Sequence, residues 1–330
     1  MVWYNSGCKS IYMAFLTALV LSCTPNSENQ NILAAKTPAA PVAPAKITIA
    51  LVMKTLTNPF FIEMESGARR AEKEFNIKLL VKTAAQETSI QQQIGIVERL
   101  IDDAVDAIVI APGDSIELIP SLARAQKAGI VVVNIDNKLD DDFARRNDME
   151  PIPFISVDNR KSAYEVTQYL ISRLQKPTNV AIIEGIRKAQ NSQDRKDGAL
   201  QAFNESELTT VVAIESAHWK IDEAYSVTQD IFELHPDIGA IFSANDMMGL
   251  GVLEYLSNSG RTDVLVASFD ALEDAVKAVL SGELVATVDQ KPAEQGYLGV
   301  QTALKMLQEE SVDDIRLINA VVINKTTLTP

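Results

Sequence analysis

The chain has 330 residues, a length that accommodates about two domains. Apolar residues make up 47% of it and charged residues 22%, a composition typical of a globular protein with a sizeable core. The formal net charge is −14 and no block of Lys and Arg interrupts it, which excludes the basic surface of a nucleic-acid-binding protein.

The first 23 residues predict an export signal. Lys9 is their only charge, and Ile11 to Leu21 form an apolar run too short for a comfortable membrane span. The end of this segment, Leu19-Val20-Leu21-Ser22-Cys23, resembles a lipoprotein cleavage box, in which the cysteine becomes the lipidated first residue of the mature chain. We therefore expect lipidation at Cys23, membrane contact through this anchor only, and a periplasmic or other extracytoplasmic location.

Residues 24–45 predict a disordered tether, because a segment so rich in Asn, Ser, Ala and Pro cannot bury enough apolar surface to order itself. Both cysteines, Cys8 and Cys23, precede this tether. The folded part is therefore expected to contain neither an internal disulfide nor a thiol nucleophile.

Beyond the tether, apolar runs alternate with helical segments. Ile90, Ile94, Val97 and Ile101 keep the 3–4 spacing of one helix face, for example. The spacing of the first four runs resembles that of the sixth to ninth, so we predict two similar α/β halves with parallel, doubly wound sheets. The runs begin near Ile47, Ile77, Ala107, Ile130 and Phe154, and then near Val180, Val211, Ala240, Val264 and Val285.

Polar and aromatic side chains follow these runs, at the ends where ligands bind in open parallel sheets. The first half contributes Lys54, Asn58, Phe60, Phe61, Asp136 and Asn137, and the second half contributes Arg195, Trp219, Asn245, Asp270 and Gln290. If the halves face one another, these groups enclose a cleft that suits a polyhydroxylated ligand. Carboxylates accept from hydroxyls, cations and amides donate to them, and an aromatic ring can stack on a sugar face.

Each of these residues also has a structural explanation. Asp136 and Asp270 could cap the segments that follow them, since Asp is a favoured N-cap. Arg195 could be a surface charge, Trp219 and the two Phe residues could be packing, and Gln290 could simply end a strand. The shared placement at strand ends favours the binding site for the set as a whole.

Five motifs together resemble those of periplasmic sugar-binding proteins of the ribose/allose class, which feed ABC transporters. The resemblance covers nearly everything from about Lys46 to the C-terminus. The motifs are Ala50-Leu51-Val52-Met53-Lys54-Thr55-Leu56-Thr57-Asn58-Pro59-Phe60-Phe61, Val133-Asn134-Ile135-Asp136, Ala244-Asn245-Asp246-Met247-Met248-Gly249-Leu250-Gly251, Ser268-Phe269-Asp270 and Ala286-Thr287-Val288-Asp289-Gln290.

The resemblance implies that Asn58, Phe60, Phe61 and Asp136 bind sugar from the first domain. It implies that Arg195, Trp219, Asn245 and Asp270 bind from the second, and that Gln290 binds near the hinge. Lys54 favours the allose-like branch, whereas ribose receptors tend to have a small hydroxyl residue at that position and Arg at the position of Asn137. The segment around Gln190, Asn191 and Gln193 is bulkier and more polar than the family pattern. The implied ligand is a monosaccharide of the allose, ribose or fructose class.

The same resemblance implies two discontinuous domains joined by three hinge segments. These segments lie near Val157-Asp158, Gln290-Lys291 and Ile318-Asn319. The N-terminal sugar-binding domain is then 46–157 plus 291–317, and the C-terminal one 158–290 plus 318–330. Sugar would close the hinge, and the closed surface would dock on an ABC permease, with a chemoreceptor or sensor kinase as the alternative partner.

An enzyme is the main alternative of another class, and we expect none. Only His218 and His235 are available, and the chain has neither a G-x-S-x-G elbow nor a phosphate-cradling G-x-x-x-x-G-K. A facing pair of Asp136 and Asp270 would leave glycoside hydrolysis open.

A transcription regulator would need a DNA-reading helix pair where the export signal lies. Residues 140–142 are three aspartates without the pattern of a calcium loop, so neither a metal nor a cofactor is expected.

Overall fold

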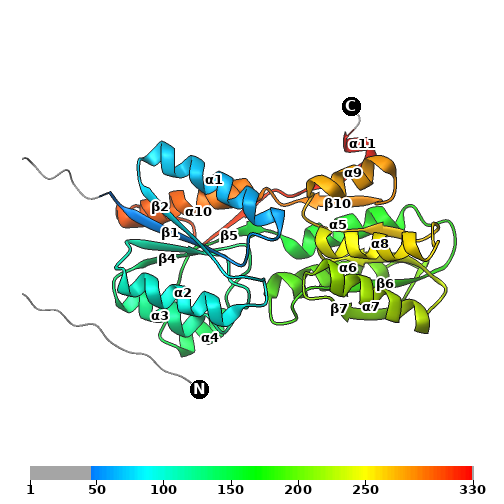
Figure 1. The fold of residues 1–330 in the computed structure, drawn as a ribbon, viewed down its shortest axis with the longest axis horizontal. Coiled ribbons are helices and arrows are strands. Elements are labelled where there is room, and N and C mark those ends of the chain that lie inside the picture. The colour runs from blue at the N-terminus through cyan, green and yellow to red at the C-terminus, as the bar shows by residue number, and fades with distance from the viewer. Residues whose placement is uncertain (1–45, 329–330) are drawn as a thin grey trace, which may run out of the picture. The chain divides into compact units, whose positions relative to one another are not determined.

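The computed structural model describes residues 46–328 and shows two six-stranded sheets with helices on their faces (Figure 1). The predicted export signal, tether and Cys23 lie outside the described residues. Each of the ten predicted apolar runs contains a strand, and the predicted α/β class is confirmed. None of the helices within residues 46–328 has the length and apolar character needed to cross a membrane.

The first sheet, sheet A, is parallel throughout. Its central strands β1 and β3 are buried on both faces, which explains why they read as unbroken apolar runs. The order of its strands is β11 (Ile315–Ile318), β5 (Phe154–Val157), β4 (Val131–Ile135), β3 (Ala107–Ile110), β1 (Thr48–Met53) and β2 (Lys78–Thr83). Its helices are α1 (Pro59–Phe75), α2 (Ile90–Asp102), α3 (Ile119–Lys127), α4 (Asp141–Arg146) and α10 (Pro292–Leu307).

The second sheet, sheet B, repeats this order with one difference. Its strands are β12 (Val321–Asn324), β10 (Ala286–Asp289), β9 (Leu265–Ala267), β8 (Ile238–Ser243), β6 (Thr178–Glu184) and β7 (Thr209–Ser216). Its helices are α5 (Asn159–Ile171), α6 (Gln190–Asn204), α7 (Ile221–Leu234), α8 (Asp246–Asn258), α9 (Glu273–Ser281) and α11 (Lys325–Leu328). All strand pairs are parallel except β10 with β12.

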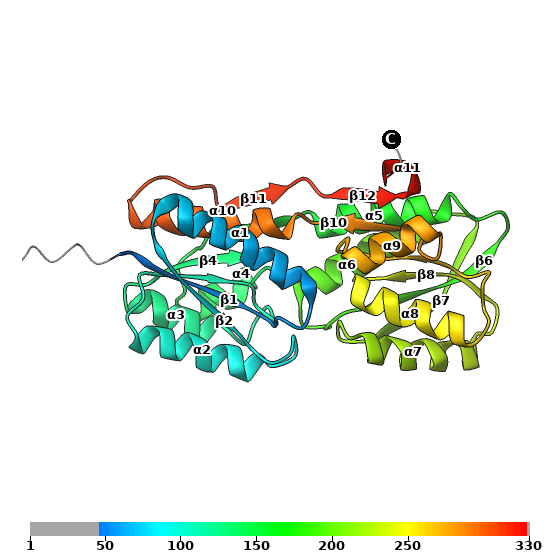
Figure 2. The same cartoon turned by 45° about the horizontal axis from the view of Figure 1, so that its top comes forward.

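The antiparallel β12 corrects the prediction of two parallel sheets. Figure 2 shows β11 and β12 as one nearly continuous extended path from sheet A to sheet B. The carboxyl ends of the two sheets face each other, so a chain that leaves sheet A in the strand direction enters sheet B against it. The direction of β12 therefore follows from the crossing rather than from any property of residues 321–324.

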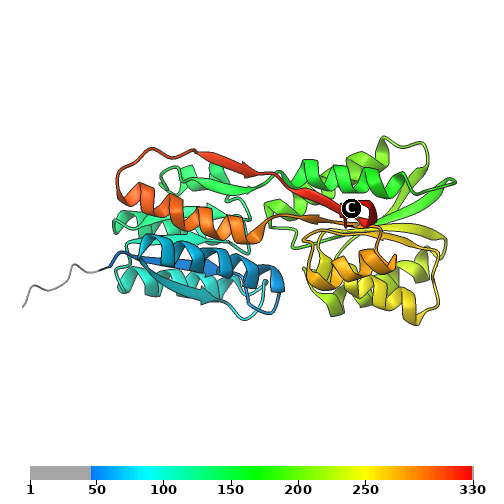
Figure 3. The ribbon, with the colours of Figure 1, turned by 90° about the horizontal axis from the view of Figure 1, so that it is seen from above.

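The chain passes between the halves at three places within residues 46–328: after β5, after β10 and after β11. The second crossing brings α10 back to sheet A, where it packs beside α1, as Figure 3 shows from above. Gly67 and Gly296 allow this close approach. A Cβ on Gly67 would lie 1.7 Å from the carbonyl oxygen of Ala293, and one on Gly296 2.0 Å from that of Met64.

We therefore expect Gly67→Ala to lower the free energy of unfolding by about 3 kcal/mol, because the clash is with backbone that cannot move aside cheaply. Gly95→Ala is the matched control within a helix. Its added Cβ meets only the end of the Arg99 side chain at 3.8 Å, so it should stabilise by roughly 0.5–1 kcal/mol. Urea unfolding followed by circular dichroism measures both changes. Equal effects of the two substitutions would contradict the role of Gly67 in packing α1 against α10.

Candidate ligand-binding site

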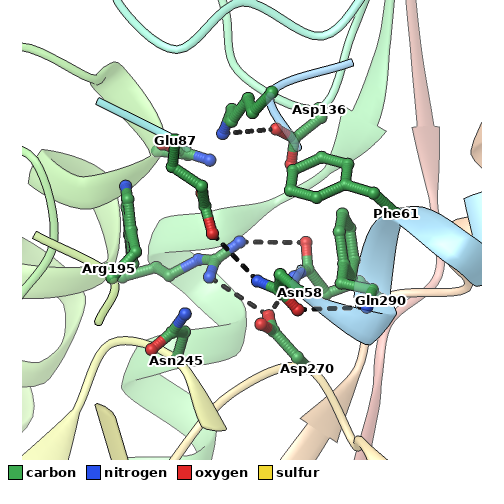
Figure 4. Close-up of a pocket in the computed structure, with 12 residues that line it drawn as sticks. Asn58, Phe61, Glu87, Asp136, Arg195, Asn245, Asp270 and Gln290 are labelled. Carbon is green, nitrogen blue, oxygen red and sulfur yellow. Dashed lines mark hydrogen bonds and ion pairs between the residues drawn. The ribbon is translucent and has the colours of Figure 1, made fainter. Parts of the chain in front are cut away.

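A small cavity lined by side chains from both halves lies where the strands of both sheets end. About 230 Å³ around it is not filled by protein atoms, and this space includes open solvent. Figure 4 shows the side chains converging on it from both sheets. The lining residues are Lys54, Asn58, Phe60, Phe61, Glu87, Asp136, Asn191, Arg195, Trp219, Asn245, Asp270 and Gln290.

A buried ion pair forms the wall contributed by sheet A. Lys54 follows β1 and Asp136 follows β4, and their side chains meet at 2.7 Å with 3% of each exposed. The Lys54 ammonium also lies 5.6 Å from the centre of the Phe61 ring. Among residues 46–328, Asp136 Oδ2 is engaged only by this ion pair, so a lone pair remains that can accept a hydrogen bond from a ligand.

Asn58 and Glu87 extend the same wall. The Asn58 side chain accepts from the Phe60 N–H at 3.0 Å, which caps α1, and it donates to Glu87 Oε1 at 2.9 Å. Burial raises the pKa of Glu87, although Lys54 and Asn58 lower it. Glu87 was not among the predicted site residues. It lies in the loop between β2 and α2, after the second apolar run, and its place in that loop is the signal that points to it.

Arg195 is the centre of the wall contributed by sheet B. Its guanidinium donates to Asn159 Oδ1 at 2.8 Å, to the Ala244 carbonyl at 2.9 Å and to Gln290 Oε1 at 3.0 Å, and it lies 3.3 Å from Asp270 Oδ1. It also lies 4.0 Å from the centre of the Phe269 ring. These contacts fix the orientation of the planar guanidinium group. Because the same group binds Asp270 and Gln290, it holds both side chains in place for a ligand.

Asp246 supports this wall from behind the cavity. Its carboxylate accepts from the Ser268 hydroxyl, from the Thr287 hydroxyl at 2.7 Å and from the Leu272 N–H at 2.7 Å, which ties α8 to the ends of β9 and β10. Burial raises the pKa of Asp246 to about 7 against these three donors. Burial also raises the pKa of Asp270 well above its usual range, although Arg195 lowers it.

These shifts predict how stability depends on pH. A carboxyl whose pKa is raised by folding favours the folded state below its unfolded pKa, and that contribution is lost as the pH rises through the folded pKa. We expect the Asp246 carboxyl alone to lower the free energy of unfolding of the ligand-free protein by about 2 kcal/mol as the pH rises from about 5.5 to about 8. Urea unfolding at both pH values measures it. Asp246→Asn should flatten the dependence, and an equally steep dependence in that variant would contradict the assignment.

The aromatic side chains lie on both sides of the cavity. Phe60 and Phe61 contact each other edge to face, with ring centroids 5.1 Å apart, and the Trp219 ring lies 5.6 Å from the Arg195 guanidinium carbon. All three rings are also buried, so packing and lining are combined in the same residues. In the part of the chain that the structure describes, two buried polar atoms of lining residues, Trp219 Nε1 and Asn191 Oδ1, have no hydrogen-bond partner. Such atoms are costly unless a ligand or water satisfies them.

The structure also resolves the capping alternative. Leu272 is the N-cap residue of α9 and Asp140 that of α4, so neither Asp270 nor Asp136 caps the next helix. Asp136, Trp219 and Asp270 instead have positive φ angles of 65°, 70° and 124°, an arrangement that costs energy and is concentrated at functional sites. Asn245 has two roles. Its side chain caps α8 by accepting from the Met248 N–H at 2.9 Å, and it also lines the cavity.

Asn137 is the one predicted site residue that does not line the cavity. It is fully buried, and its side chain donates to the Pro112 carbonyl at 3.1 Å and accepts from the Asn191 N–H at 3.1 Å. His218 and His235 are not lining residues either. Among residues 46–328, no three or more His, Cys, Asp or Glu side chains are grouped so that they could hold a metal ion.

Two α/β halves with a small polar cavity between their facing strand ends define a two-lobed ligand-binding protein. A family model described as periplasmic binding protein domain matches residues 49–311. The chain belongs to this family.

Relatives of the chain share most of its length. A D-ribose/D-allose-binding protein of Pseudomonas aeruginosa is 38% identical over 296 residues, which are 88% of this chain and 90% of the relative. A D-allose-binding periplasmic protein of Escherichia coli is 30% identical over 84% of this chain and 91% of its own length. A crystal structure of an ABC transporter periplasmic solute-binding protein from Actinobacillus succinogenes with bound D-allose matches with a TM-score of 0.81. The two chains are 37% identical, and the match covers 85% of this chain and 98% of the other.

Proposed function

We propose that this protein is an extracytoplasmic solute-binding protein that captures a neutral monosaccharide, with D-allose as the first candidate, and delivers it to an ABC permease. The observation that carries the proposal is the convergence of donors, acceptors and rings on one small cavity between the halves. Relatives whose names include D-allose or D-ribose support the choice of ligand class.

The lining residues suit sugar hydroxyls in a specific way. Asp136 accepts from vicinal hydroxyls while Lys54 donates to the same group, and Asp270 with Arg195 does so from the other half. A charge-assisted hydrogen bond in such a site is worth roughly 1.5–3 kcal/mol. Phe60 or Phe61 and Trp219 then stack against the two faces of the sugar ring. Low-micromolar or tighter affinity, roughly −8 kcal/mol, is in keeping with this set.

Binding closes the hinge because the sugar touches both halves and thereby stabilises the closed state. In this proposal the N-terminal sugar-binding domain is 46–157 plus 291–317, and the C-terminal one is 158–290 plus 318–330. Gln290 supports the hinge assignment, because it lines the cavity directly before α10 returns to sheet A. The predicted lipid on Cys23 and the 24–45 tether hold this body near the membrane that contains the permease.

Tryptophan fluorescence tests the function directly. Trp3 precedes the predicted cleavage site, so Trp219 is the single reporter in the mature chain. We expect a saturable fluorescence change with allose, measured alongside ribose, fructose, glucose, galactose and xylose. Calorimetry on the unmodified protein is the control, because it does not depend on the Trp219 reporter. Absence of heat and of fluorescence change with all six sugars would refute the proposed ligand class.

A further inference from the structure

The helix α6 begins without a cap of its own. It carries the lining residues Asn191 and Arg195, yet its N-cap residue is Ala189, whose side chain cannot accept a hydrogen bond. The first N–H groups of a helix have no partner within it, and Ala is among the poorest N-cap residues. This is the segment whose polar residues depart from the family pattern.

Side chains from the opposite half cap the first turn of α6 instead. The Gln190 N–H donates to Ser115 Oγ at 2.9 Å, and the Asn191 N–H donates to Asn137 Oδ1 at 3.1 Å. Ser115 lies in the loop after β3, and Asn137 follows β4. Both acceptors therefore belong to the half built on sheet A, whereas α6 belongs to the half built on sheet B.

Both acceptors are held firmly in their own half. Asn137 donates to the Pro112 carbonyl at 3.1 Å and is fully buried, and Ser115 is 6% exposed and lies 3.4 Å from Asn137 Oδ1. Two further contacts surround the cap. The Ser115 N–H donates to the Lys188 carbonyl at 3.1 Å, and Lys188 pairs with Glu117 at 2.7 Å on the exposed rim.

We propose that Ser115 and Asn137 are positioning residues for sugar binding, which cap α6 across the cleft and thereby favour the closed state without touching the sugar. The inference rests on the proposed function. Neither residue lines the cavity, and the cap is lost when the halves separate, since donors and acceptors lie on different halves. Capping also fixes the first turn of α6, which positions Asn191 and, one turn later, Arg195.

A matched pair of variants tests the hydrogen bond itself. Ser115→Thr keeps the hydroxyl group. Ser115→Val introduces a side chain of nearly the same shape as threonine that lacks the hydroxyl group. We expect Ser115→Val and Asn137→Ala each to weaken affinity for the best-binding sugar about tenfold through faster dissociation, measured by calorimetry and stopped-flow fluorescence. Ser115→Thr should restore most of the affinity. The ratio of affinities between two sugars should stay unchanged in all three variants, because the residues do not contact the ligand.

Two results would overturn the inference: equal affinity of the Val and Thr variants, or a changed ratio between sugars, which would show contact with the ligand. Unaltered melting temperatures control for folding. Hydrogen exchange of the Gln190 and Asn191 amides at saturating sugar, where the halves are closed, gives a second readout, and we expect faster exchange in Ser115→Val than in Ser115→Thr. If the wild type binds no sugar, the proposed function fails; if it binds sugar and exchange is equal in the two variants, the cap is refuted.

Discussion

Arg195→Ala is expected to weaken monosaccharide binding at least about 100-fold, the largest effect of any single substitution in the cavity. The guanidinium is 3% exposed and binds Asn159, Ala244, Asp270 and Gln290 together. Its removal takes away the group that holds Asp270 and Gln290 in place for the ligand. It also breaks a buried pair, which lowers the free energy of unfolding by on the order of 3–5 kcal/mol. Calorimetry with the best-binding sugar measures the loss.

Two further variants separate binding from folding. Arg160→Ala is the control, because Arg160 is an exposed arginine on α5 whose side chain donates to Gln201 at 3.2 Å and does not line the cavity. It should leave affinity unchanged. Combining Arg195→Ala with Asp270→Asn should recover stability, since the unpaired charge is gone, but should not recover binding. An Arg195→Ala protein that binds within about threefold of the wild type would show that Arg195 only packs.

Asp136→Ala and Asp270→Ala are each expected to weaken binding by about 2 kcal/mol or more, roughly 30-fold, because each removes charged acceptors from a site closed to water. The two carboxylates come from opposite halves, so their effects test both walls of the cavity. Sugar binding measured by calorimetry gives the size of each effect.

The control for this pair is Asp274→Ala. Its side chain is 73% exposed on α9, close in sequence to Asp270, and it pairs with Lys277 at 3.0 Å. Exposed pairs contribute little, so its affinity should match that of the wild type. Adding Lys54→Met to Asp136→Ala removes the buried cation that would otherwise be left alone, so a folded double variant without binding would support the assignment. Wild-type affinity in both single variants would rule out the proposed site.

The placement of this site could be predicted because the rule behind it is geometric. Buried strands read as apolar runs, and the residue after each run lies at the carboxyl edge of its sheet, as Lys54, Asp136 and Asp270 do. Glu87 and Asn191 were not predicted as site residues because neither directly follows a strand. Glu87 lies in the loop between β2 and α2, and Asn191 lies in the first turn of α6, where distance along the chain no longer indicates distance from the sheet edge.

The role of Asn137 and the direction of β12 could not be predicted for a different reason. Both depend on how the halves meet, because Asn137 makes its distinctive contact with α6 and β12 pairs with β10 after crossing from sheet A. No local pattern encodes such a contact. The sequence alone also leaves capping by Asp136 and Asp270 open, because Asp is a common N-cap. The residues that take the N-cap positions are Asp140 in α4 and Leu272 in α9.

The composition of the cavity wall also bears on which ligands the proposed site would exclude. Three carboxyl groups, those of Glu87, Asp136 and Asp270, face two cations, Lys54 and Arg195, and burial raises the pKa of Glu87 and of Asp270. Both cations are already engaged, Lys54 by Asp136 and Arg195 by Asp270. A phosphorylated sugar or a uronic acid would bring a further negative charge to a wall whose two cations are already paired, in a space with little water to screen it. If the protein carries sugars to a permease as proposed, this wall would favour neutral sugars over acidic ones.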